Sequence, residues 1–229
     1  MASVIFGVPP SSVTSDQRDL GKQAILGLSY GMGADKFRTS CMLKGMNISN
    51  SLAERAKNAF REKHARMVQL WYQIDRFTKE ATMFWAGGGV YQAGRIKISG
   101  TKMGGTRCLL VQLPSGRQLY YREPMIVDGQ LTYFGQIPMT QTWGRIKLYG
   151  AKIFENVCQA IAADLMSYGA RRAESNWMVP FALIHDQALA IQTAGQKPDQ
   201  FAAALQQLPP WATGLPLKAE AKLTEYYQK

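Results

Sequence analysis

The stretch RDLGKQAILGLSYGMGADKF, residues 18 to 37, places two cations one helical turn apart beside an apolar strip. Arg18, Lys22 and Leu26 recur at every fourth position, a spacing that puts them on one face of a helix. A helix that only packs against a core does not need the cations. A helix that is solvated all round does not need the apolar strip, so this face is the first candidate for a binding function.

The limits of this helix are marked by capping signals. Thr14–Gln17 has a capping-box pattern, which predicts that the helix begins near Ser15. The Tyr-Gly pair at Tyr30 and Gly31 predicts that the helix ends at Gly31 or just before it. Eight helical residues separate Tyr30 from Lys22, so its ring is expected about 80° around the helix from that side chain.

Two interpretations of the cations remain open on spacing alone. Like charges one turn apart repel each other, and a bound triphosphate would compensate them. Arginine can hold phosphate oxygens through two parallel hydrogen bonds, and lysine can neutralise charge on a leaving pyrophosphate. In the alternative, Arg18 and Lys22 form a solvated basic face, Tyr30 is buried and a glycine caps the helix.

The charge balance also points to a polyanionic partner. The 229 residues contain 27 Lys and Arg against 16 Asp and Glu, a net charge of +11. Nucleic acid is the first partner to expect from such an excess, although a merely soluble basic protein has the same balance.

Cysteine usage and hydropathy limit the class of protein. The three cysteines, Cys41, Cys108 and Cys158, form no C-x-x-C pair, so the sequence predicts neither a disulfide framework nor a zinc site. No uncharged apolar run approaches about 18 residues, which predicts a soluble intracellular protein without membrane contact. A chain that is 46% hydrophobic can bury one core or two small ones.

In the remaining chain, the spacing of the apolar residues changes twice, from helical to strand-like and back to helical. Residues 50–86 have apolar side chains at threes and fours, which predicts one or two amphipathic helices. In residues 87–150, short segments whose apolar residues recur at every second position are separated by turn signals. This pattern predicts a small antiparallel sheet. A helix is expected over 151–173, and two short apolar runs then flank a polar tip at 185–187, which is typical of a hairpin. Trp143, Trp177 and Trp211 are expected to be packing residues.

These segments resemble the family A DNA polymerases in the form found in bacteriophages. RDLGKQAILGLSYGMG has the motif B pattern R-x3-K-x7-Y-G, and further segments match in the same order. They are LPSGRQLYY at 113–121, YGAKIFENVCQAIAADL at 149–165, HDQ at 185–187 in place of His-Asp-Glu, and PPWATGLPLKAEAK at 209–222, which resembles the C-terminus of the family.

The resemblance implies roles for the residues of the first helix. Arg18 and Lys22 would hold the triphosphate of an incoming deoxynucleotide, and Lys22 would also act as the acid near the pyrophosphate. Leu26 stands where the family usually has Phe or Tyr against the sugar. Tyr30 would lie beside the templating base.

It also implies DNA-binding and metal-binding residues. Gln159 would touch the minor groove of primer-template DNA, with help from Glu155 and Asn156. His185 would approach the primer terminus, and Asp186 would bind catalytic Mg²⁺. Gln187, expected among the DNA contacts, replaces a family glutamate with a neutral amide.

The family uses two Mg²⁺ ions, and two carboxylates from different segments must hold them. The second carboxylate belongs to motif A, and MASVIFG at residues 1–7 resembles the stretch that follows this motif. Glu123, Asp128 and Glu155 are not obvious substitutes. The resemblance therefore implies a split polymerase, whose second subunit supplies motif A, the thumb and the exonuclease and shares the two Mg²⁺ ions.

Together these observations predict an α+β chain: a helical fingers module over 1–90, a β-rich insertion over 91–150, and the C-terminal half of a palm over 151–229. The predicted function is DNA-directed DNA polymerase activity in the cytoplasm of an infected bacterial host, as one subunit of a heteromer. The alternative is a non-catalytic polymerase remnant that binds nucleic acid or nucleotide. An uncovered apolar surface is expected for the split enzyme and not for the stand-alone binder.

Overall fold

The computed structural model describes residues 1–138 and 140–227, and within them the chain forms two compact units. The first unit contains Met1–Leu113 and Gln118–Val157. The second contains the loop Pro114–Arg117 and the chain from Cys158 onward. Each unit has a hydrophobic cluster of its own.

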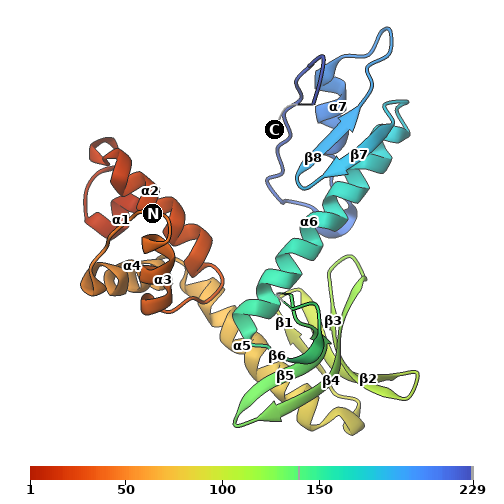
Figure 1. The fold of residues 1–229 in the computed structure, drawn as a ribbon. Coiled ribbons are helices and arrows are strands. Elements are labelled where there is room, and N and C mark those ends of the chain that lie inside the picture. The colour runs from red at the N-terminus through yellow and green to blue at the C-terminus, as the bar shows by residue number, and fades with distance from the viewer. Residues whose placement is uncertain (139, 228–229) are drawn as a thin grey trace. The chain divides into compact units, whose positions relative to one another are not determined.

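The first unit begins with helices, and the α-helices among them pack around one hydrophobic core (Figure 1). They are α1 (Ala2–Phe6), η1 (Pro10–Ser12), α2 (Ser15–Leu28), α3 (Ala34–Met42), α4 (Asn50–Lys63), α5 (Ala65–Met83) and η2 (Trp85–Gly87). The predicted stripe over residues 50–86 proves to be two helices, which meet at His64. Its apolar positions face the core, since Phe60, Trp71 and Ile74 are buried.

A six-stranded antiparallel sheet follows in the same unit, with the strands in sequence order. They are β1 (Val90–Ala93), β2 (Ile96–Met103), β3 (Thr106–Gln112), β4 (Gln118–Val127), β5 (Gln130–Gln136) and β6 (Trp143–Lys147). Helix α5 packs on one face of this sheet, where Gly100 has no room for a side chain because a Cβ would lie 2.8 Å from the Ala81 carbonyl oxygen. The predicted antiparallel sheet is therefore confirmed.

Helix α6 (Gly150–Glu174) starts against α5. A Cβ on Gly150 would lie 1.8 Å from the Trp71 carbonyl oxygen, so only glycine permits this approach. The Gly150 N–H donates to the Asp75 carboxylate at 3.1 Å, which satisfies a group that the helix itself leaves without a partner. The contact ties the beginning of α6 to the helical core.

The second unit is built around the C-terminal part of α6. It contains β7 (Pro180–Ile184), β8 (Gln187–Ala190), α7 (Pro198–Leu205) and η3 (Pro210–Ala212). Ala173, Met178 and Ala204 form its buried cluster, with Phe201 against them. The loop Pro114–Arg117 joins this unit through Asp164, which accepts a hydrogen bond from the Ser115 hydroxyl at 2.6 Å and forms an ion pair with the Arg117 guanidinium, also at 2.6 Å.

The mixture of helices and antiparallel strands agrees with the predicted class. The division into fingers, insertion and palm modules stays a prediction. The expectation that Trp143 and Trp177 are packing residues is wrong, because their side chains are 59% and 87% exposed. Within residues 1–138 and 140–227, no helix is long and apolar enough to cross a membrane.

Candidate nucleotide-binding site

Two reciprocal hydrogen bonds define the start of α2. The Gln17 backbone N–H donates to the Thr14 hydroxyl at 3.3 Å, and the Thr14 N–H donates to the side-chain carbonyl of Gln17 at 3.1 Å. Both bonds satisfy N–H groups that lack partners inside the helix. The predicted capping box is confirmed, and it sets the helical register of the cationic face.

Helix α2 separates an apolar side from a cationic one. Its buried residues are Leu20, Gly21, Ala24 and Leu28. Arg18, Lys22 and Leu26 are exposed, as their spacing predicts. Leu26 is apolar and yet 56% exposed, so it contributes nothing to the core. The helix thus presents two cations and an apolar side chain to solvent on one face.

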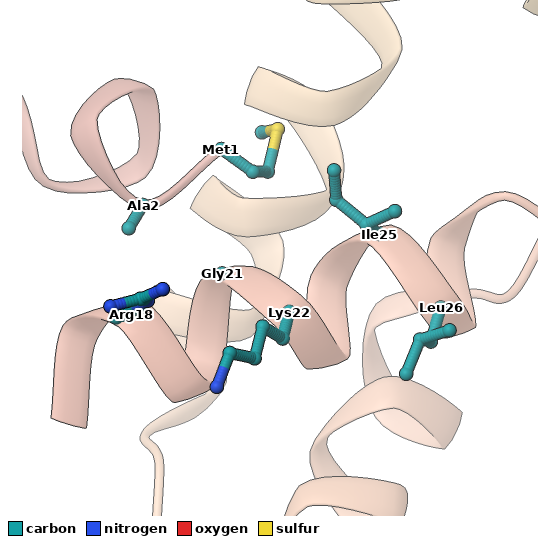
Figure 2. A pocket seen from close by; sticks show the side chains of 7 residues that line it. All are labelled: Met1, Ala2, Arg18, Gly21, Lys22, Ile25 and Leu26. Carbon is teal, nitrogen blue, oxygen red and sulfur yellow. The ribbon is translucent and has the colours of Figure 1, made fainter. Parts of the chain in front are cut away.

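An open hollow of about 460 Å³ lies along this face. It is lined by Met1, Ala2, Arg18, Gly21, Lys22, Ile25 and Leu26, which Figure 2 shows along α2 and beside it. Gly21 permits the close approach of α1, because a Cβ there would lie 2.8 Å from the Ala2 nitrogen. The hollow combines apolar walls with two cations, a composition suited to a ligand that has both an apolar part and anionic groups.

Lys22 is paired within the helix. Its Nζ lies 3.0 Å from the Asp19 carboxylate, and both side chains are more than half exposed. The repulsion between Arg18 and Lys22 is therefore relieved in part by a carboxylate, a contribution that the sequence analysis missed and that the i, i+3 spacing could have revealed. An exposed pair of this kind contributes about 0.2–1 kcal/mol, so a phosphate can replace the carboxylate at small cost.

Tyr30 lies just beyond α2. The helix ends at Leu28, and the Tyr30 and Gly31 N–H groups close a turn on the Gly27 and Leu28 carbonyls. The helix therefore ends just before Gly31, as predicted, while the predicted angle between Tyr30 and Lys22 stays a prediction. Gly31 has φ 73°, and a Cβ there would lie 2.7 Å from the Ala151 Cβ. This contact holds the turn against the start of α6 and leaves Tyr30 partly exposed.

The first turns of α6 carry the predicted DNA contacts. Glu155 pairs with Lys152 at 2.8 Å. The Asn156 amide donates to the Tyr121 hydroxyl at 2.9 Å, so this amide also links α6 to the sheet. Burial raises the pKa of Tyr121 to about 12. Gln159 is exposed about one turn further along the helix.

The predicted hairpin tip is confirmed. Strands β7 and β8 pair up to Ile184 and Gln187, so His185 and Asp186 form the turn and are exposed. His185 has φ 55°, a left-handed conformation that costs a residue with a Cβ about 1–2 kcal/mol. Gln187 is the first residue of β8, and its side-chain oxygen accepts a hydrogen bond from Tyr227 at 3.0 Å.

The side chain of Asp186 fits a role as one ligand of a hard cation, because an exposed carboxylate offers oxygen atoms. In the described part of the chain, no group of three or more His, Cys, Asp or Glu residues could hold a metal ion. The metal-binding role of Asp186 stays a prediction.

The structure brings together two sets of predicted residues. Arg18, Lys22 and Leu26 share one face of α2 in the first unit, and His185 and Asp186 share the hairpin tip in the second. The roles of these residues, and the arrangement in which helix and hairpin face one nucleotide, stay predictions.

Comparison with known proteins confirms the resemblance to phage polymerases. The chain is 31% identical, over its whole length, to a DNA polymerase of Bacillus phage SP02. It spans 35% of the length of that protein. No protein-family model matches the chain.

Proposed function

We propose that the chain supplies the nucleotide-binding helix and one metal-binding carboxylate to a DNA polymerase that carries out template-directed DNA synthesis. The observation that carries the proposal is the exposed face of α2, where Arg18, Lys22 and Leu26 lie in line beside an open hollow. The similarity of the whole chain to a phage DNA polymerase supports the same conclusion.

Arg18 and Lys22 bind the triphosphate of the incoming nucleotide in this proposal. The Arg18 guanidinium donates two parallel hydrogen bonds to phosphate oxygens. Lys22 leaves Asp19 for the phosphates, neutralises the charge that develops on the pyrophosphate and donates a proton to it. Both side chains are exposed, so neither has to be uncovered before the nucleotide binds.

Leu26 and Tyr30 contact the nucleoside part. Leu26 offers an aliphatic surface to the sugar, and it has no hydroxyl or ring edge with which to read the 3′ position. Tyr30 offers the face of its ring to a base. The contact between Gly31 and Ala151 limits the movement of the turn that carries Tyr30.

Asp186 and His185 act at the primer terminus. When bound, Mg²⁺ would supply electrostatic stabilisation for the displacement at the primer terminus. Asp186 would supply one of the carboxylates that hold these ions, and His185 contacts the end of the primer. Gln159, assisted by Asn156 and Glu155, contacts the minor groove, and Gln187 lies next to the primer strand.

The second metal-binding carboxylate, the thumb and the exonuclease come from polypeptide outside these 229 residues. We assign them to a second subunit, which shares the two Mg²⁺ ions with Asp186. One carboxylate at a hairpin tip cannot hold two divalent ions against water, because each ion needs about six oxygen ligands. The activity of the chain therefore depends on its partner.

A second candidate function is nucleic-acid binding without catalysis. Gln187 favours it, since a neutral amide occupies the position after Asp186 and is hydrogen bonded to Tyr227. In this candidate the basic surface is retained for DNA, and no partner is needed.

Primer extension separates the two functions. The purified chain is assayed with primer-template DNA, deoxynucleotides and Mg²⁺, alone and together with the polypeptide encoded nearest to it. Asp186→Asn is compared with Asp199→Asn, which removes an exposed carboxylate from α7 in the same unit. Extension by the mixture that Asp186→Asn abolishes and Asp199→Asn retains supports the split enzyme. DNA binding without extension in any mixture supports the second candidate.

A further inference from the structure

The two faces of the six-stranded sheet have different environments. Ile98 and Gly100 point toward α5, and on the same side the rings of Tyr91 and Phe77 stack with centroids 5.4 Å apart. Alternate residues of a strand point to the opposite side, which we call the outer face. The registers of the strands place on it Lys97, Tyr120, Arg122, Phe134, Trp143, Arg145 and Lys147.

Aromatic and cationic side chains are in contact on the outer face. The rings of Phe134 and Trp143 lie 5.9 Å apart with an interplanar angle of 30°. The Arg145 guanidinium lies over the Phe134 ring, 6.0 Å from its centroid. Arg122 is the partner of Phe134 on the neighbouring strand. Trp143, Phe134 and the two arginines therefore form one continuous platform across three strands.

A hydrogen bond to a strained segment holds the platform in place. Arg145 donates to the Glu123 backbone carbonyl, and its guanidinium lies 3.9 Å from the Glu123 carboxylate. Glu123 has φ 47° at an irregularity where the pairing of β4 and β5 shifts. Irregularities of this kind redirect side chains, and here the redirected carbonyl orients Arg145 across the ring of Phe134.

The outer face contains exposed aromatic residues that the protection of a sheet edge does not require. β6 is an edge strand, and charged residues such as Arg145 and Lys147 prevent pairing with another chain. An exposed tryptophan does not serve that purpose, yet Trp143 is 59% exposed and Tyr120 is 42% exposed. Exposed aromatic rings among cations are the pattern with which proteins bind unpaired bases and the phosphates between them.

We propose that the outer face binds single-stranded DNA. The bases stack on Trp143 and Tyr120, while Arg122 and Lys147 contact phosphates. Stacking on a side chain needs a free flat face of a base, and inside a duplex these faces are covered by the neighbouring base pairs, so a single strand is preferred over duplex DNA. The site lies outside the hollow on α2, and it does not depend on the proposed binding of nucleotide there.

Titration of the full chain with a fluorescein-labelled oligothymidylate of about 16 nucleotides tests this site, with fluorescence anisotropy as the readout. Trp143→Ala is expected to weaken binding about 5- to 150-fold, because a stacked base contributes about 1–3 kcal/mol. Trp143→Phe retains an aromatic ring and should recover most of the affinity. Both variants are checked by circular dichroism and urea unfolding, so that loss of the sheet is not mistaken for loss of the site.

The salt dependence tests the phosphate contacts separately. Each contact to a single strand adds about 0.7 to the slope of log affinity against log salt, so Arg122→Ala combined with Lys147→Ala should lower the slope by about 1.4. Lys36→Ala removes an exposed cation of α3 and should leave the slope unchanged. Arg122 and Lys147 are exposed, so their substitutions should not disturb the fold. The proposal can therefore still be tested if Trp143→Ala does not fold.

Three results would overturn the proposal. The chain binds no oligothymidylate, or it binds a duplex of equal length as tightly, or the substitutions at Trp143, Arg122 and Lys147 leave affinity unchanged. Loss of oligonucleotide affinity in Arg18→Ala and Lys22→Ala but not in the outer-face variants is a form of the third result. It would place the single strand on α2 and leave the outer face for a protein.

Discussion

The Lys22 ammonium lies 3.0 Å from the Asp19 carboxylate on the exposed side of α2. The cation proposed to bind phosphate is thus held by an internal carboxylate, and a nucleotide must replace that carboxylate. The pair explains how Arg18 and Lys22 can lie one turn apart without a ligand, and it makes the first prediction possible.

Asp19→Asn should increase the affinity for a deoxynucleoside triphosphate about 1.5- to 5-fold. The substitution removes a competing anion, and the exposed pair contributes only about 0.2–1 kcal/mol. Equilibrium titration with a fluorescent deoxynucleotide measures the change, and Asp35→Asn, in the first turn of α3, is the control. Lower affinity in Asp19→Asn would show that Lys22 needs the pair in order to be positioned.

Gly150→Ala should destabilise the first unit by about 3 kcal/mol or prevent folding. The new Cβ would lie 1.8 Å from the Trp71 carbonyl oxygen, so α6 would have to move away from α5. Urea unfolding followed by circular dichroism gives the free energy of unfolding. Gly87→Ala is the matched control, because a Cβ at Gly87 meets nothing within 4 Å. Equal stability of the two variants contradicts the close packing of α6 on α5.

Stability should fall between about pH 10 and 12 because of Tyr121. Its pKa is raised from 10 to about 12 in the folded protein, since burial disfavours the phenolate. Below pH 10 the Tyr121 hydroxyl is protonated in both the folded and the unfolded state, so the free energy of unfolding is not reduced by this group. As the pH rises toward 12 the unfolded state loses its proton first, which costs about 1.4 kcal/mol per pH unit.

Guanidinium unfolding of the native chain and of Tyr121→Phe at several pH values isolates this effect, because the other groups titrate in both proteins. The native chain should lose more stability than Tyr121→Phe above pH 10. Parallel losses in the two proteins would mean that Tyr121 is accessible to water.

His185→Gly should raise the free energy of unfolding by about 1 kcal/mol and lower primer extension by the complemented enzyme. Glycine adopts φ 55° without the penalty of a Cβ, whereas histidine does not. A residue retained against local stability is expected where it has a function. The hypothesis is wrong if His185→Gly is less stable than the native chain and extends primers equally well.

Local signals in the sequence predicted much of the secondary structure. The capping-box pattern of Thr14 and Gln17 predicted the start of α2, and the two apolar runs around His185 and Asp186 predicted the hairpin. The apolar stripe placed Trp71 and Ile74 correctly in the core. These features depend on contacts within a few residues or on one helical face, so a short window of sequence contains their cause.

Other features depend on contacts that no short window contains. The Tyr30-Gly31 pair predicted that α2 ends near this point, but no short window contains the close approach of Ala151, from a distant segment, to Gly31. Trp143 appeared to be a packing residue because its type is usually buried, but its position on the outer side of an edge strand exposes it. The pair of Asp19 and Lys22 is different, because the two residues lie three positions apart in one helix and their spacing alone indicates the contact.

The affinity of the full chain for a deoxynucleoside triphosphate tests the central claim most directly. Arg18→Ala and Lys22→Ala should each weaken binding about 10-fold or more, because a hydrogen bond to a charged group contributes about 1.5–3 kcal/mol. Lys36→Ala, which removes an exposed cation of the next helix, should stay close to the native affinity. Equal affinity in all three variants would contradict the assignment of α2 as the nucleotide-binding helix.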